Sequence, residues 1–262
     1  DEVICDYSSH IYQHEAGGIA FNSSASVNLL QGTNGKITVD LVQAALKEEN
    51  IHFSKQSLVS VENTTNKGGG ACYELSDLQD LSTFCKSKNL AFHMDGARLY
   101  NAIVKTNTKP SDYGSIFDSI SVCMSKGLGA PIGSLLIGNN AFIAQAKRVR
   151  KVLGGGMRQA GYLAAACDYA LNTNIDLLQH DHRRAKEIET TLKTLHYVKE
   201  VLPVETNIVV FSVTDPTSFV QYLKEKNILC SAISATQIRF VTHLQFTDEM
   251  LEVLVKALLN WK

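Results

Sequence analysis

The 262-residue sequence lacks several features that would assign a class of protein directly. No apolar run approaches the length of a membrane-spanning helix, and we expect no signal peptide at its start. No block of lysine and arginine stands out, and the net charge is only −1. We therefore expect neither nucleic acid nor a membrane surface as a partner.

The cysteines form no CxxC pair and have no spacing typical of a metal site. Most of them stand among aliphatic residues, as small buried hydrophobic side chains do. The six are Cys5, Cys72, Cys85, Cys123, Cys167 and Cys230. We expect free thiols, a reducing cytoplasmic location and no metal ion.

The remaining composition, 45% hydrophobic and 19% charged, is that of an ordinary globular protein. The sequence contains no internal repeat and no low-complexity segment. A chain of this length can bury the core of one large domain, or of a large domain with a small appendage.

One stretch points to chemistry. Residues 119–129 form an apolar, β-branched run that stops at Lys126, which small residues flank. We predict a strand covered on both faces that ends at this lysine, where partial burial would favour the nucleophilic neutral amine. Alone, the pattern is more typical of a solvated surface lysine.

A second apolar run, 90–94, leads to Asp95, which lies 31 positions before Lys126. That separation suits one strand–crossover–strand unit, which would place both residues on the same edge of a parallel sheet. Open α/β sheets bind ligands at that edge. A lysine that can bond to an aldehyde and a carboxylate that can hold a protonated pyridine nitrogen are what pyridoxal 5'-phosphate requires.

Three motifs in order, at 93–102, 125–134 and 154–159, resemble the low-specificity L-threonine aldolases of the aromatic amino acid β-eliminating lyase/threonine aldolase family. The resemblance implies an α/β fold of the aspartate aminotransferase type, with a mainly parallel large domain over 1–172. A connecting helix and a small α+β domain would follow over 173–262. It also implies pyridoxal phosphate as cofactor, an amino-acid substrate, and a homodimer or homotetramer with shared active sites.

The resemblance also assigns roles to single residues. Lys126 would carry the cofactor and Asp95 would hold its ring nitrogen, while His10 would stack on the ring. Further expected cofactor contacts are Arg98, Ser125, Lys151 and Arg158, the last two to the phosphate. Many relatives carry a histidine where Thr65 stands, so we expect Thr65 to contact the substrate hydroxyl only as a hydrogen-bonding group.

Two arginines are candidates for the substrate carboxylate. Arg98 stands three residues after Asp95, and we expect it one helical turn further on, aimed at the same site. Arg239 lies inside the apolar strand expected at 237–241, where an unpaired charge would be costly, so we expect an anionic partner. By resemblance, that anion is the α-carboxylate of the substrate.

The resemblance further implies an N-terminal arm, a helix and a Gly-Thr turn around the cofactor phosphate, and the sequence shows none of these. We therefore expect it to be part of a longer chain. The leading hypothesis is cleavage of L-threonine or L-allo-threonine to glycine and acetaldehyde. β-Elimination or transamination on the same cofactor, or an inactive truncated chain, are the alternatives.

Periodicity of the apolar residues predicts the other elements. Expected strands lie at 2–5, 57–61, 134–138, 207–213 and 228–230. Expected helices begin after Thr38 and at Ser76, run through 142–149, or span 160–171, 175–195, 218–226 and 248–260.

Overall fold

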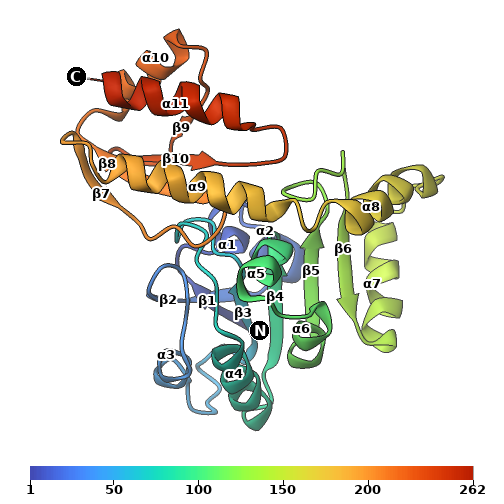
Figure 1. Cartoon of the computed structure of the whole chain (residues 1–262). Helices are drawn as coiled ribbons and strands as arrows, with labels where there is room; N and C mark the ends of the chain where they lie inside the picture. The colour runs from blue at the N-terminus through green and yellow to red at the C-terminus, as the bar shows by residue number, and fades with distance from the viewer. Residues whose placement is uncertain (262) are drawn as a thin grey trace.

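The computed structural model describes residues 1–261, which build two separate β-sheets (Figure 1). The first sheet has six strands in the order β2-β1-β3-β4-β5-β6. Its strands are β1 (Glu2–Asp6), β2 (Ser26–Leu30), β3 (Gln56–Glu62), β4 (Ala91–Gly96), β5 (Ser119–Cys123) and β6 (Ser134–Gly138). All neighbours pair in parallel except β5 and β6, which are antiparallel. The expected mainly parallel α/β fold is confirmed.

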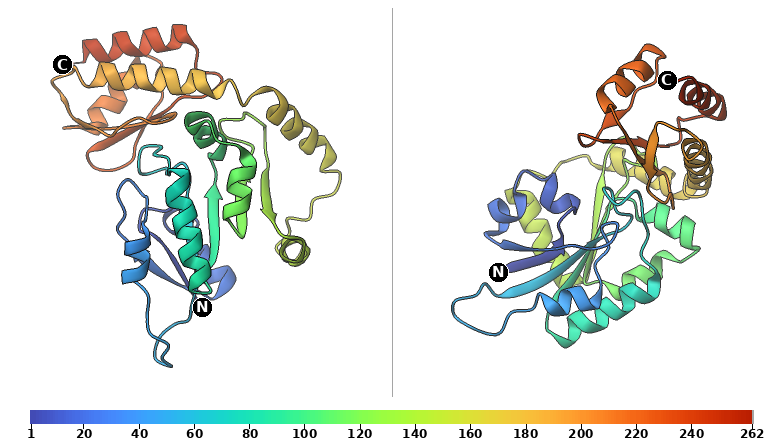
Figure 2. Two further views of the ribbon diagram at one scale, coloured as in Figure 1. Left: turned by 60° about the horizontal axis from the view of Figure 1, so that its bottom comes forward. Right: turned by 90° about the vertical axis from the view of Figure 1, so that its left-hand side faces the viewer.

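Helices cover both faces of this sheet (Figure 2). The chain moves from β1 outward to β2 and then back across to β3, β4 and β5, so right-handed crossovers place the first helices opposite the later ones. The helices are α1 (His10–Gln13), α2 (Gly18–Ser23), α3 (Val39–Ala44), α4 (Leu75–Ser87), α5 (Leu99–Thr106), α6 (Pro110–Ile116) and, after β6, α7 (Asn140–Val152). As a result, the carboxyl ends of the parallel strands stay open at one edge.

The second sheet is antiparallel and has the order β7-β8-β10-β9. Its strands are β7 (Val198–Val201), β8 (Ile208–Val213), β9 (Ser231–Ala232) and β10 (Gln237–Val241). Two helices, α8 (Gly161–Thr173) and α9 (Leu178–Leu192), lead to it, and α10 (Pro216–Glu225) and α11 (Asp248–Asn260) follow. Each sheet has its own apolar core. None of the helices in the described residues is long and apolar enough to cross a membrane.

Most of the predicted elements are present, and β6, β10 and α11 have the predicted bounds. The strand expected at 228–230 is wrong, because the chain first pairs with β10 at Ser231 and Ala232. The expectation that a strand runs up to Lys126 is also wrong, since β5 ends at Cys123. Five elements were not predicted, namely α1, α2, β2, α6 and β7; these are short, and β2 and β7 lie at sheet edges.

The expectation that β5 is covered on both faces needs correction as well. Its apolar residues Ile120 and Val122 are buried, whereas the alternating Ser119, Ser121 and Cys123 are half-buried. The neighbouring strand β6 is exposed along most of its length, with aliphatic side chains on both faces. Alternation of this kind marks a strand with one well-covered face.

Asp181 on α9 gives a stability prediction. Its side chain is fully buried, neither carboxylate oxygen has a hydrogen bond, and Arg184 Nη1 lies 3.7 Å away. Burial raises the pKa of Asp181 to about 6, and Arg184 offsets only part of this effect. Because the folded-state pKa exceeds the unfolded one, the folded protein should lose stability as pH rises from about 4 through 6.

We expect Asp181→Asn to remove up to about 3 kcal/mol of this pH dependence. Urea unfolding of wild type and variant between pH 4 and 7.5 measures it. Asp80→Asn, on an exposed position of α4, is the control and should keep the wild-type slope. Parallel stability curves for wild type and Asp181→Asn would contradict the assignment.

Candidate active site

Three polar groups come together at the carboxyl ends of β3, β4 and β5. Glu62 ends β3 and lies in register with Asp95 on β4, and Asp95 in turn lies in register with Ser121 on β5. Lys126 follows in the loop that joins β5 to β6. The predicted placement of Asp95 and Lys126 on one edge of a parallel sheet is therefore what the structure shows.

Asp95 is buried and held at two points. Its Oδ1 accepts the Ala97 N–H at 3.0 Å, and its backbone carbonyl accepts the Asn63 N–H at 2.9 Å. Within residues 1–261, no hydrogen bond reaches Oδ2. One oxygen thus fixes the carboxylate, while the other is available to a ligand N–H.

Lys126 projects from a loop with a fixed backbone. Its carbonyl accepts the Gly129 N–H at 2.9 Å, and the Met124 carbonyl accepts the Ala130 N–H at 3.1 Å. Gly127 lies against α5, where a Cβ would come within 3.0 Å of the Asn101 Oδ1 atom. Lys126 is half-buried, and its Nζ atom has no ion pair or hydrogen bond with any described residue.

Arg98 and Arg239 face the same edge from different sheets. Arg98 is the N-cap of α5 and not one helical turn beyond Asp95, as predicted, because Asp95 belongs to β4. Burial, and then the charge of Arg239, lower the pKa of Arg98, although Glu62 and Asp95 oppose this effect. Neither arginine forms a salt bridge within residues 1–261.

The partner of Arg239 differs from the expected anion. Its Nη1 donates to the Asn66 Oδ1 atom at 2.7 Å, so a neutral amide, and not a carboxylate, holds it. Two neighbouring guanidinium groups that form no salt bridge within residues 1–261 can bind an anion.

His10 is the first residue of α1 and reaches the cluster from the opposite side of the sheet. Its Nε2 lies 3.2 Å from Glu15 Oε1, and its backbone N–H donates to Glu62 Oε2 at 3.1 Å. Its side chain is one-third exposed. Its ring is therefore oriented by Glu15 and still accessible.

Thr65 is not brought to the open face of the cluster. It is 1% exposed, and among the described residues its hydroxyl has no hydrogen-bond partner. Its side chain lies beneath Gly35 and Gly68, at 3.1 Å and 2.4 Å from the Cβ positions those glycines lack. This position does not support the predicted contact with a substrate hydroxyl.

Three further predicted residues form no described contact with Asp95. Ser125 is exposed in the loop after β5. Lys151, at the end of α7, folds over Gly156, and Arg158 is exposed in the loop before α8. No described contact joins Lys151 or Arg158 to Asp95, so their roles at a phosphate stay predictions.

Sequence reasoning did not single out Glu62 and Asn66. Glu62 follows the pattern that located Asp95, since it ends a buried strand, and Asn66 lies four positions further on. The missing information was the register, which pairs Glu62 with Asp95 and is set only by the folded sheet.

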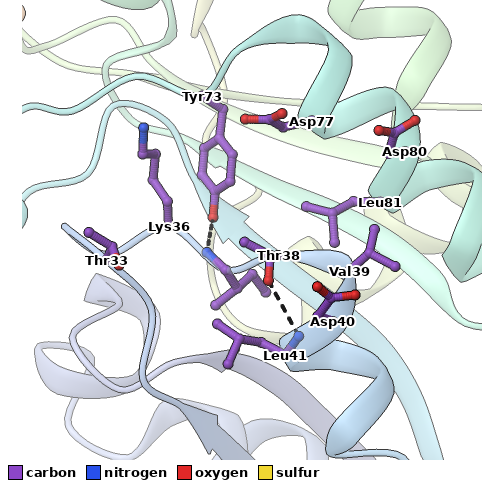
Figure 3. A pocket seen from close by; sticks show the side chains of 11 residues that line it. Thr33, Lys36, Thr38, Val39, Asp40, Leu41, Tyr73, Asp77, Asp80 and Leu81 are labelled. Carbon is purple, nitrogen blue, oxygen red and sulfur yellow. Dashed lines mark hydrogen bonds between the residues drawn. The ribbon is translucent and has the colours of Figure 1, made fainter.

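A separate cavity of about 320 Å³ lies between α3 and α4 (Figure 3). Tyr73 closes one side of it, and its hydroxyl accepts the Ile37 N–H at 2.7 Å. Three aspartates, Asp40, Asp77 and Asp80, surround it. None of the predicted site residues lines this cavity.

The donor set of the cluster fits the ring and the amino-acid part of a pyridoxal phosphate complex. A free amine on Lys126 suits an aldehyde, the open oxygen of Asp95 suits a pyridine N–H, and two unpaired guanidinium groups suit a carboxylate. Three buried polar atoms beside Glu62 also have no partner, namely Asn63 Nδ2, Thr64 Oγ1 and Thr65 Oγ1. No described group of the cluster forms a comparable cradle for the phosphate.

The fold is that of the fold-type-I enzymes that use pyridoxal phosphate. A threonine aldolase from Leishmania major superimposes with a TM-score of 0.85 at 24% identity, over 98% of this chain and 76% of that one. The family profile described as beta-eliminating lyase matches residues 1–216.

Two curated relatives extend the match. The low specificity L-threonine aldolase of Escherichia coli K12 is 37% identical over 254 residues, which are 96% of this chain and 74% of that protein. The enzyme of the same name from Candida albicans is 34% identical over 266 residues, 98% of this chain and 69% of that protein. The chain belongs to the beta-eliminating lyase family, and its family resemblance to the threonine aldolases is confirmed.

The loop after β3 permits a structural test of the site. A Cβ at Gly68 would lie 1.9 Å from the Asn34 carbonyl oxygen, so Gly68→Ala must displace backbone near Thr65 and Asn66. We expect the free energy of unfolding to fall by about 1–3 kcal/mol. Gly114→Ala on α6, where nothing lies within 4 Å, should be neutral or stabilise by about 0.5–1 kcal/mol. Urea unfolding measures the stability of both variants. Equal stabilities of Gly68→Ala and Gly114→Ala would contradict the close packing at Gly68.

Proposed function

We propose that this chain is a pyridoxal-phosphate-dependent aldolase that cleaves L-threonine and L-allo-threonine to glycine and acetaldehyde. The proposal rests on the placement of Asp95 and Lys126 at one sheet edge. Arg98 and Arg239 lie at the same edge, and neither forms a salt bridge within the described residues. The names of the relatives in Escherichia coli and Candida albicans supply the substrate. The substrate is accordingly a small amino acid.

When bound, pyridoxal phosphate accepts the electron pair released from the bond that breaks at Cα of an amino acid. Lys126 would hold the cofactor aldehyde, and the carboxylate of Asp95 would keep a proton on the ring nitrogen. Arg98 and Arg239 bind the substrate carboxylate and thereby set the orientation of the Cα–Cβ bond. Holding this bond in one orientation would favour its cleavage over competing reactions.

The hydroxyl proton of threonine must leave before the Cα–Cβ bond breaks. His10 is the side chain on this chain that suits the task, because Glu15 at 3.2 Å orients its Nε2 as the partner of a general base would. Thr65 cannot act as a base near neutral pH, and its buried hydroxyl lies under Gly35 and Gly68. A water held by the cofactor phosphate is the alternative proton acceptor.

The proposal also keeps the division into a large domain, 1–172, and a smaller unit, 173–262, together with a cytoplasmic location and a homodimer or homotetramer. Exposed apolar side chains on β6 and on the following helices support assembly. These include Leu135 (44% exposed), Leu136 (45%) and Ile137 (45%) on β6, with Val149 and Val152 on α7. Monomers rarely leave so many adjacent apolar residues in water.

Product analysis separates the proposed reaction from its alternatives. With pyridoxal phosphate and either threonine isomer, we expect equal amounts of acetaldehyde and glycine, measured by reduction of the aldehyde with NADH and by amino-acid analysis. A 2-oxo acid as the product would instead show β-elimination, which the family description favours as the second candidate, or transamination. No visible cofactor band and no product would show an inactive chain.

Lys126→Ala tests the assignment of the lysine. We expect loss of the visible absorbance band of the bound cofactor and a fall in kcat of at least about 10³-fold, since the attachment point is removed. Lys86→Ala, at an exposed position of α4, is the control and should behave as wild type. Absorbance and turnover that survive in Lys126→Ala would reject this residue.

A further inference from the structure

Glu62 is a buried carboxylate, 5% exposed, for which the proposed reaction has no chemical role. It forms no salt bridge within residues 1–261 and accepts two backbone N–H groups instead. Its Oε2 accepts from His10 at 3.1 Å, and its Oε1 accepts from Asn66 at 2.9 Å. A carboxylate without a cation partner is costly to bury, so these two bonds are what hold it there.

The bond to His10 satisfies a donor that its own helix leaves free. His10 is the first residue of α1, and the first N–H groups of a helix have no intrahelical acceptor. The N-cap residue, Ser9, makes no side-chain capping bond. Glu62, 52 positions further along the chain, therefore caps α1 and fixes where His10 begins.

The bond to Asn66 reaches the second sheet. Asn66 Oδ1 accepts from Arg239 Nη1 at 2.7 Å, while the Asn66 N–H is held by Glu62. Glu62 also stands in register with Asp95 on the neighbouring strand. One carboxylate thus contacts, directly or through a single amide, the segments that carry His10, Arg239 and Asp95.

The electrostatic environment of Glu62 is typical of a residue in a functional site. Burial, and then the neighbouring Asp95, raise the pKa of Glu62 to about 7, although the two backbone N–H groups and Arg98 lower it. Groups with such strongly perturbed pKa values gather at functional sites.

We propose that Glu62 is a positioning residue that fixes His10 and, through Asn66, Arg239 relative to Asp95. The catalytic part of this inference rests on the proposed aldolase activity, whereas the structural part does not. Glu62 touches neither substrate nor cofactor in this account and acts through the groups it holds.

Glu62→Gln is the diagnostic variant. A glutamine side chain has one acceptor oxygen, so it can satisfy only one of the two N–H groups and turns its NH₂ toward the other. Glu205→Gln is the matched control, because Glu205 accepts a single backbone N–H, from Cys72 at 2.9 Å, which an amide oxygen can still accept. Both substitutions replace a glutamate by a glutamine. They differ because Glu62 accepts two backbone N–H groups and Glu205 accepts one.

Amide hydrogen exchange, resolved to single residues, tests the structural part on the purified chain with and without pyridoxal phosphate. We expect the His10 and Asn66 amides to be protected in wild type and in Glu205→Gln. In Glu62→Gln, at least one of them should exchange about tenfold faster or more. An unprotected His10 amide in wild type, or unchanged exchange in Glu62→Gln, would overturn the inference.

Kinetics with L-threonine test the catalytic part. In Glu62→Gln we expect the visible cofactor band to remain while kcat/KM falls at least about tenfold, and Glu205→Gln should stay within about twofold of wild type. Faster amide exchange with unchanged kcat/KM would reject the catalytic part. An inactive wild type would refute the proposed function alone, since the exchange data stand without it. If Glu62→Gln does not fold, Glu62→Asp, which keeps the charge but is one methylene shorter, is judged by the same two measurements.

Discussion

Parallel pairing of β3, β4 and β5 is the constraint on which the site depends. This pairing brings three strand ends to one edge and sets Glu62 beside Asp95, with Lys126 in the next loop. A shift of one residue in this register would turn each of these side chains to the other face of the sheet. The buried residues of the strands and the helices packed on them therefore determine the chemistry indirectly, by holding that register.

Two carboxylates on adjacent strands are electrostatically unfavourable, and the structure offsets their repulsion with backbone donors. Asp95 accepts an N–H from Ala97, and Glu62 accepts from His10 and Asn66. Hydrogen bonds from backbone N–H groups stabilise a carboxylate without neutralising it. Within residues 1–261, Arg98 and Arg239 consequently form no salt bridge, as an anion-binding site requires.

The two sheets meet beside this edge through specific polar contacts. Arg239 reaches Asn66, and Thr206 Oγ1 donates to the Gly70 carbonyl at 2.8 Å. Each bond links the loop after β3 to the second sheet or to the segment just before β8. A residue from the second sheet can therefore take part in a site built on the first, with a fixed geometry.

The sequence by itself determined the elements that carry strong local signals and the motif residues at strand ends. Apolar alternation located β6 and β10, helical periodicity located α11, and the run before Asp95 identified a strand that ends in a carboxylate. Motif resemblance added the family and the cofactor, because a cofactor requires particular residue types, and these stand within short motifs of the sequence. These inferences need only neighbours along the chain.

Only the tertiary structure decided which distant residues meet. It paired Glu62 with Asp95, gave Arg239 an amide partner in place of an anion, and buried Thr65 under two glycines. The physical reason is that strand register and the packing of one sheet against another follow from the summed burial of many residues far apart in the chain, which no local pattern encodes.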